Sequence, residues 1–390
     1  MLLPGTSGCS RFSWPRNVSE AASLTLQCGD SELDRDFPAA MLPNYDLQGV
    51  LFAVNERQII EYIAALAGPA DARLIKGIGD DCAVIQKDGR QVWLLTMDTL
   101  IEGVHFNAAF HPPEKLGRKA VSVNVSDIAA MGGKPLFVLL SVGMAKGFDE
   151  SWFQAYARGL TDACRDYGCL LIGGDTVASP QGFNCTLTVI GEVEADRVVF
   201  RSGARAGDTI WVSGSLGSAA AGLELLQRGI ELGNAAFVPF QEQHLNPRAR
   251  VELGSSLGAS GLVHAMMDLS DGLATDLAHL CKQSGMGARL VARNLPGVAA
   301  LAEAARLCGA DPEQWAIGGG EDYELLFTAS PEHQCRLLDL GRQCGLTLSP
   351  VGTMVTGDGV TLIRQRPDGT SEEVAIAYQG FDHFRNREGR

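Results

Sequence analysis

Carboxylate side chains recur along this 390-residue chain in one kind of setting, inside a glycine-containing turn or beside an apolar run. Two clusters, Gly79-Asp80-Asp81 and Asp268-Leu269-Ser270-Asp271-Gly272, lie nearly half a chain apart. The other members are Asp98, Asp127, Asp175 and Glu321. Carboxylates that converge without Lys or Arg partners repel one another strongly, and divalent cations relieve that repulsion. Because Mg²⁺ is usually held by a few carboxylates and substrate phosphates, this pattern predicts a metal-dependent enzyme acting on phosphate compounds.

Each of these residues also has an ordinary structural interpretation. Gly-Asp pairs favour turns, which would explain Asp80 and Asp175 without any ligand. Asp98 would cap the end of a strand, Asp127 would be a solvated helix residue, and Asp271 would N-cap the helix that follows it. Taken together, however, the carboxylates close apolar elements at their ends, where loops gather into a site. The pattern of the whole set therefore favours the metal-site hypothesis.

Two basic residues are further candidates. His105 follows Asp98 in the segment Gly103-Val104-His105-Phe106 and is either a structural histidine or a ligand contact. Arg201 is either a surface charge or a fork for a phosphate group at a domain hinge. Neither common phosphate cradle is present. Gly132-Gly133-Lys134-Pro135 lacks the spacing and the Ser/Thr of a Walker A loop, and no GxGxxG follows a strand.

The elements predicted in the first half place these residues at or near element ends. An amphipathic helix over 56–66, capped by Asn55, precedes a strand over 92–96 that delivers Asp98. A helix from Pro112-Pro113 to about residue 131 puts Asn124 and Asp127 on one face. The other predicted elements are a strand over 136–142, a helix over 151–167, a strand over 170–172 ending on Gly173-Gly174-Asp175, and a strand over 184–193.

A turn-rich segment over 201–208 predicts a domain boundary, and the alternation of strands and helices restarts after it. Strands are expected over 209–212, 265–268, 289–292 and 323–328, with edge strands near 348–353 and 360–364. Helices are expected over 218–228, 247–257, 272–283, 298–307 and 331–344, and a loop over 229–245. The predicted fold class is therefore α/β (α+β), with two domains over 49–200 and 205–390.

Composition narrows the function classes. A hydrophobic content of 46% with 20% charged residues is typical of a globular protein with an ample core. The net charge of −14 argues against nucleic acid or anionic membranes as partners, since those favour basic surfaces. No apolar run approaches the roughly 18 residues of a membrane span. The 10 cysteines form no CxxC pair, so buried free thiols and a reducing cytoplasm are expected.

The first 48 residues carry no helical or strand periodicity, and they mix Pro, Gly and Ser with an acidic patch. No uninterrupted apolar segment suits a secretion signal, and the acidic residues do not suit a targeting peptide. We expect a disordered extension over 1–48, with Met41 as an alternative start of the folded protein.

Taken in order, a series of motifs over about residues 50–384 resembles the thiamine-monophosphate kinase family. The motifs are GIGDDCAVI, TMDTLIEGVHF, KAVSVNVSDIAAMGG, LIGGDTV, RSGARAGD, MDLSDGL, GGGEDYELLFT and GFDHF. A broader ATP-dependent superfamily, which includes aminoimidazole ribotide synthetase, shares this pattern of acidic motifs. The combination of EGVHF, GGEDYEL and GFDHF resembles the kinase in particular.

The resemblance implies a cytoplasmic enzyme that phosphorylates thiamine monophosphate with ATP, giving thiamine diphosphate in the last step of its biosynthesis. It also implies several Mg²⁺ ions per site and a homodimer whose N-terminal sheets pair into a barrel. The first domain would bind ATP and Mg²⁺, and the second would complete the substrate cleft. Transfer would be in line and would need no general base, because the acceptor phosphate is already largely ionised.

The resemblance also assigns residues, motif by motif. The Mg²⁺ ligands would be Asp80, Thr96, Met97, Asp98, Asp127, Asp175, Asp268 and Asp271, with Asp98 and Asp127 the most critical. The ATP contacts would be Gly174, Asp175, Arg201 and Ser270, and the thiamine phosphate contacts His105, Glu321 and Phe381. Met97 stands where family members often carry Ser or Thr, so only its backbone carbonyl could bind metal. Asp81 receives no metal in this assignment.

Two other functions remain as alternatives. A superfamily ATPase with another substrate would share the acidic motifs, and product identification would separate it from the kinase. A non-catalytic nucleotide sensor would be expected to have lost metal ligands, whereas this chain keeps the matching positions.

Overall fold

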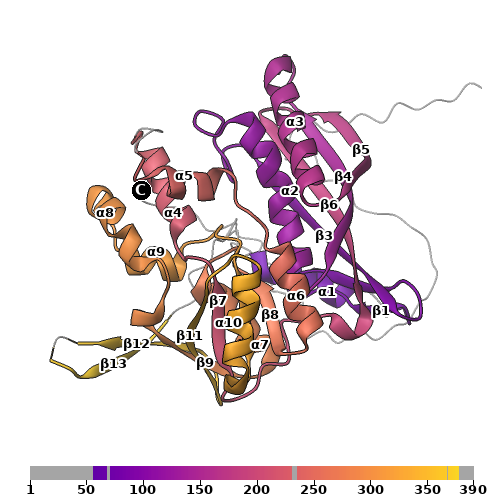
Figure 1. The fold of residues 1–390 in the computed structure, drawn as a ribbon. Coiled ribbons are helices and arrows are strands. Elements are labelled where there is room, and N and C mark those ends of the chain that lie inside the picture. Colours follow the sequence, from indigo (N-terminus) through magenta and orange to yellow (C-terminus); the bar gives the residue numbers. More distant parts are fainter. Residues whose placement is uncertain (1–55, 68–70, 231–234, 367, 377–390) are drawn as a thin grey trace, which may run out of the picture. The chain divides into compact units, whose positions relative to one another are not determined.

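The computed structural model describes residues 56–67, 71–230, 235–366 and 368–376 (Figure 1). All of them belong to one compact unit that begins at Val54. The predicted cap Asn55, the predicted substrate contact Phe381 and the predicted extension over 1–48 lie outside the described residues. The first described element is helix α1 (Glu56–Leu66), which confirms the predicted first helix.

The first sheet contains six strands in the order β1-β2-β3-β6-β4-β5. Neighbouring strands run antiparallel, except that β4 and β5 run parallel. On β6, alternate side chains from Phe183 to Val193 are buried, so one face of the sheet carries the core. The strands are β1 (Leu74–Lys76), β2 (Ala83–Gln86), β3 (Gln91–Ile101), β4 (Lys134–Met144), β5 (Leu170–Ala178) and β6 (Phe183–Glu194).

Helix α2 (Pro113–Ala130) supports the site and is buried along most of its length. Pro113 begins it, at a position where the missing N–H of proline removes no helical hydrogen bond. α2 packs tightly on α3 (Glu150–Asp166), because a Cβ at Gly117 would lie 2.1 Å from the carbonyl oxygen of Tyr156. On its other side, a Cβ at Gly254 would lie 2.1 Å from the carbonyl oxygen of Ala129. Glycine at both crossings therefore lets neighbouring helices approach α2 closely.

The second sheet contains seven strands in the order β13-β12-β9-β11-β7-β10-β8, of which only β9 and β12 are paired in parallel. Its strands are β7 (Thr209–Ser213), β8 (Val263–Asp268), β9 (Gly287–Val291), β10 (Leu325–Ala329), β11 (Leu348–Val355), β12 (Val360–Gln365) and β13 (Ser371–Ala375). Its helices are α4 (Ser218–Gln227), α5 (Val238–Leu245), α6 (Val251–Ser260), α7 (Leu273–Ser284), α8 (Val298–Cys308), α9 (Pro312–Gly318) and α10 (Gln334–Gln343). The two mixed sheets with their helices confirm the predicted α+β fold class.

Helix α2 is in contact with elements of the second half, namely α6 and β8 (Figure 1). One apolar cluster of the second half surrounds residues such as Ile210, Leu290 and Leu326, and another joins Ala130 of α2 to residues such as Trp211. The position of α2 between the two sheets explains why residues from both halves can meet at one site. Among the described residues, no helix combines the length and apolarity needed to cross a bilayer.

Several predicted boundaries were wrong. β3 does not stop at residue 96, and Asp98 lies inside the strand because β3 pairs with β6 along its whole length. β5 likewise continues through Gly173 and Gly174 to Ala178, because Asp175 and its neighbours pair with β4. Neither β11 nor β12 is an edge strand, since each has a neighbour on both sides. The predicted loop over 229–245 contains helix α5.

Candidate active site

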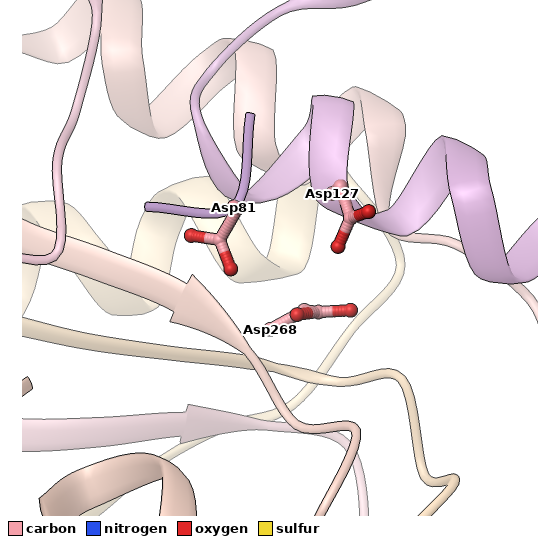
Figure 2. Close-up of side chains that lie close together, drawn as sticks. All are labelled: Asp81, Asp127 and Asp268. Carbon is pink, nitrogen blue, oxygen red and sulfur yellow. The ribbon is translucent and has the colours of Figure 1, made fainter. Parts of the chain in front are cut away.

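Three carboxyl groups meet beside α2. Asp81 comes from the turn before β2, Asp127 from α2 and Asp268 from the last position of β8. One ligand oxygen from each residue lies within 4.8 Å of the others. Figure 2 shows the three side chains turned toward a common space. Since Asp81 and Asp127 precede the 201–208 segment and Asp268 follows it, the group joins the two halves of the chain.

A neighbouring side chain orients each of these carboxylates. Thr96 on β3 donates its hydroxyl hydrogen to Oδ2 of Asp127 at 2.5 Å. Ser126, the residue before Asp127, donates to Oδ2 of Asp268 at 2.6 Å. The family resemblance implies a metal-binding role for Thr96. The structure gives it a contact with a carboxylate of the group, which holds that carboxylate in position.

Arg201 neutralises part of the negative charge. Its guanidinium group donates to Oδ1 of Asp81 from Nη2 at 2.6 Å and from Nε at 3.1 Å. Its backbone N–H donates to Oδ1 of Asp80 at 3.2 Å, and Lys76 lies 3.3 Å from the other oxygen of Asp80. The expectation that the carboxylates lack basic partners was therefore wrong for this motif. The partner of Asp81 lies 120 residues away in the sequence, where local patterns give no sign of it.

Burial and mutual repulsion make the group costly to ionise. Burial raises the pKa of Asp81 to about 7, against the lowering effect of Arg201, and raises the pKa of Asp268 to about 6. The pKa of Asp127 is raised well above its usual value, first by burial and then by Asp98, Asp268 and Asp81. A bound cation would reverse these shifts by stabilising the ionised forms.

The donor set fits a hard divalent cation. All three ligands are carboxylate oxygens, which is the preference of Mg²⁺ rather than of softer metals. Oδ2 of Asp81 is buried and has no hydrogen-bond partner among the described residues, so it is available to a ligand. The family resemblance implies Asp80 as the metal ligand of this motif, whereas Asp81 is the one grouped with Asp127 and Asp268.

The other predicted metal ligands lie outside this close group. Asp98 is exposed on β3, and its backbone N–H donates to Oδ1 of Asn124 at 2.9 Å. It is nevertheless near enough to raise the pKa of Asp127. Met97 is also exposed, with 64% of its surface accessible. Asp175 is exposed on β5, an edge strand of the first sheet.

The loop between β8 and α7 is organised by a carboxylate that sequence analysis missed. Asp276 is buried on α7, and its Oδ2 accepts hydrogen bonds from the backbone N–H groups of Asp271 and Gly272, both at 3.1 Å. Asp276 therefore fixes the loop that carries Ser270 and Asp271. The only available sequence signal was its position one turn into the helix, which also suits an ordinary helix residue.

Glu321 is held on both of its carboxylate oxygens. Oε1 lies 2.8 Å from Nζ of Lys119 on α2, and Oε2 lies 2.9 Å from Nδ1 of His244 on α5. The backbone of Glu321 has a φ of 68°, in the left-handed region that non-glycine residues rarely adopt. Neither Lys119 nor His244 was a predicted site residue.

A backbone ladder connects Glu321 to the carboxylate group. The N–H of Glu321 donates to the carbonyl of Ser270, and the N–H of Tyr323 donates to the carbonyl of Leu269, both at 2.8 Å. These bonds continue the antiparallel pairing of β10 with β8, in which Leu325 faces Asp268. The predicted ATP contact Ser270 and the predicted acceptor contact Glu321 are therefore adjacent in space.

Two further predicted residues have clear local roles. Nδ1 of His105 accepts a hydrogen bond of 3.0 Å from the backbone N–H of Ile101, which shapes the turn after β3. A Cβ at Gly174 would lie 1.7 Å from the carbonyl oxygen of Leu140, so only glycine fits there beside β4. Contacts of His105 and Gly174 with a ligand stay predictions.

Two family models match most of the described chain. The AIR synthase related protein N-terminal domain matches residues 79–193, and the AIR synthase related protein C-terminal domain matches residues 205–365. The carboxylate group therefore takes Asp81 and Asp127 from the first matched region and Asp268 from the second.

Individual relatives carry a more specific name. The thiamine-monophosphate kinase of Escherichia coli K12 is 38% identical over 314 residues, covering 79% of this chain and 91% of the relative. The enzyme of the same name from Aquifex aeolicus is 36% identical over 313 residues, covering 79% and 93%. A solved structure described as AaThiL complexed with AMPPCP and TMP has a TM-score of 0.72 and 33% identity, covering 84% of this chain and 97% of that one.

Proposed function

Because the chain belongs to the thiamine-monophosphate kinase family, we propose that it transfers the γ-phosphoryl group of ATP to thiamine monophosphate, giving thiamine diphosphate and ADP. The observation that carries the proposal is the carboxylate group of Asp81, Asp127 and Asp268, drawn from both matched domains. A solved relative that holds an ATP analogue together with TMP supports the same reaction.

Mg²⁺ is part of the proposal, and Asp81, Asp127 and Asp268 would hold it. Bound there, the metal would neutralise charge on the phosphate groups and align them for transfer. Thr96 and Ser126 keep two of the ligand carboxylates in fixed orientations, and Arg201 offsets the charge of the third. The predicted ligands Asp80, Met97, Asp98, Asp175 and Asp271 stay part of the proposal, as do several ions per site.

The remaining chemistry needs no general base from the protein. A phosphate monoester has a second pKa of about 6, so the acceptor is largely dianionic at neutral pH. The chain must instead bring two polyanionic phosphate groups together. Basic side chains and backbone N–H groups near the carboxylates would offset the repulsion between them. Arg201, Ser270, Gly174 and Asp175 are the proposed ATP contacts, and Glu321, His105 and Phe381 are the proposed acceptor contacts.

We also propose a homodimer formed through the first sheet. β5 is an edge strand, and all nine of its residues are exposed in the single chain, including Leu170 at 63% and Ile172 at 54%. A long, exposed and apolar edge strand normally pairs with another strand or is covered. Pairing between two copies of this sheet, as in the predicted barrel, would bury these side chains.

A cytoplasmic location completes the proposal. The described cysteines are free thiols, and most of them are buried, which suits a reducing compartment. Cys335 is exposed and Cys344 half-buried, so the expected burial does not extend to these two thiols.

A product assay tests the function. Purified protein is incubated with ATP, Mg²⁺ and thiamine monophosphate, and thiamine diphosphate is quantified by chromatography. Thiamine diphosphate should form only when all three are present, and unphosphorylated thiamine should give none. ATP hydrolysis without thiamine diphosphate would contradict the proposal and would indicate another acceptor within the superfamily.

A further inference from the structure

We infer that Lys119 and His244 are positioning residues that hold the Glu321 carboxylate ready for the acceptor. This inference deepens the proposed function and rests on it, because Glu321 is a proposed contact of thiamine monophosphate. Lys119 is supplied by α2 of the first domain, and His244 by α5 of the second. The orientation of one binding group thus depends on both domains.

The exposure of the three side chains identifies Glu321 as the member that a ligand can reach. The Lys119 side chain is fully buried, and that of His244 is 2% exposed, whereas that of Glu321 is 27% exposed. Lys119 and His244 therefore contact Glu321 from its buried side, and each contacts one carboxylate oxygen. A ligand meets only the open side of the carboxylate.

The carboxylate retains hydrogen-bonding capacity on that side. Each carboxylate oxygen can accept about two hydrogen bonds, and one site on each oxygen is directed at Lys119 or His244. The remaining sites suit a ligand that presents N–H donors or positive charge. Thiamine monophosphate offers both, in an amino group and a cationic ring.

Lys119 and His244 also keep Glu321 ionised. Burial alone would raise the pKa of Glu321, but Lys119 and His244 outweigh burial and lower the pKa below its usual value. His244 itself has a lowered pKa, chiefly through burial, and its Nδ1 lies 2.9 Å from Oε2 of Glu321. An ionised acceptor makes stronger hydrogen bonds than a protonated one.

The backbone of Glu321 needs this support. Its φ of 68° lies in a region that is unfavourable for a non-glycine residue, so surrounding contacts must fix it. The N–H of Glu321 is held by the Ser270 carbonyl, and its carboxylate by Lys119 and His244. Without the side-chain contacts, the carboxylate would be free to leave the acceptor side.

Steady-state kinetics of the full chain test the inference. Lys119→Met keeps the length and apolar character of the side chain but removes the charge. The KM for thiamine monophosphate should rise roughly 10-fold, because the Glu321 carboxylate loses its buried cationic partner. The kcat and the KM for ATP should stay within about twofold. Calorimetric titration with thiamine monophosphate should show the same loss of affinity.

Lys115→Met is the matched control. Lys115 also lies on α2 and pairs with Glu242 of α5, but both side chains are partly exposed and neither contacts Glu321 in the described contacts. Its KM for thiamine monophosphate should be unchanged. At the other partner, His244→Gln keeps an N–H donor and should restore part of the affinity that His244→Leu loses.

A double-mutant cycle separates positioning from general stability. In a Glu321→Gln background, Lys119→Met should change the KM for thiamine monophosphate no further. If active wild-type protein and Lys119→Met share the same KM for the acceptor, or if only kcat falls, the inference is overturned alone. If wild-type protein forms no thiamine diphosphate, the proposed function fails and the inference fails with it.

Discussion

The hydroxyl group of Ser126 donates a 2.6 Å hydrogen bond to Oδ2 of Asp268, a residue 142 positions further along the chain. Ser126 belongs to the first matched domain and Asp268 to the second. One carboxylate of the proposed metal site is therefore oriented by a donor from the other domain. Proper docking of the two domains is a condition for a correctly formed site.

Ser126→Ala should weaken the site more than the fold. Loss of a hydrogen bond to a charged group costs about 1.5–3 kcal/mol, part of which should appear as a higher Mg²⁺ requirement. Activity measured against Mg²⁺ concentration should show a higher midpoint. Ser255→Ala is the control, because Ser255 bonds the Gly133 carbonyl and not a carboxylate. An equal shift in both variants would contradict the role given to Ser126.

Asp127→Asn should abolish most turnover while leaving the metal-free fold intact. A lost metal ligand removes several kcal/mol of stabilisation, so kcat should fall roughly 100-fold or more. The same change removes repulsion with Asp81 and Asp268, so thermal stability without Mg²⁺ should be equal or higher. Melting curves with and without Mg²⁺, together with assays, check both parts. Near wild-type turnover would exclude Asp127 from the metal site.

Asp322→Asn should remove a pH dependence of stability. Asp322 is buried and accepts hydrogen bonds from the backbone N–H groups of Gly217 and Ala219, and burial raises its pKa to about 7 from 3.8. Between these values the folded chain binds more protons, so its contribution to stability falls as pH rises from about 4 to about 7. The decline is at most roughly 1.4 kcal/mol per pH unit.

Denaturant unfolding at pH 5 and pH 8 provides the measurement. The free energy of unfolding of wild-type protein, minus that of Asp322→Asn, should be larger at pH 5. Parallel pH profiles for the two proteins would show that Asp322 does not carry this dependence.

Leu170→Glu should convert a dimer into a monomer. Leu170 lies at the start of edge strand β5, where a carboxylate would be buried without a partner by pairing with a second copy. Analytical ultracentrifugation should give a dimer mass for the wild type and a monomer mass for the variant. Glu150→Lys, an exposed change on α3, should leave the dimer intact. A monomeric wild-type protein would refute the dimer proposal.

Local patterns predicted the elements better than their ends. Helix α2 could be predicted because Pro112-Pro113 and the apolar spacing act within a few residues. The extensions of β3 past Asp98 and of β5 past Asp175 depend on partners β6 and β4 elsewhere in the chain. Cross-strand hydrogen bonds of that kind leave little local signal, so both strands were predicted too short.

The residue types of the candidate site could be predicted from the sequence, but the exact residues that meet there and their partners could not. The motif Gly79-Asp80-Asp81 predicts a carboxylate at the metal site, but only the folded chain shows that Asp81 is the one beside Asp127 and Asp268. Its pairing with Arg201 depends on tertiary contacts. Lys119 is a fully buried lysine within a helix, and a lysine at such a position normally indicates solvent exposure.

The ladder between residues 268–270 and 321–325 has a consequence for substrate length. Asp268 and Glu321 belong to neighbouring segments joined by backbone hydrogen bonds, which restrict any change in their separation. Because Asp268 is a proposed metal ligand and Glu321 a proposed acceptor contact, we expect an acceptor with a longer or shorter linker between its ring system and its phosphate to be a poorer substrate.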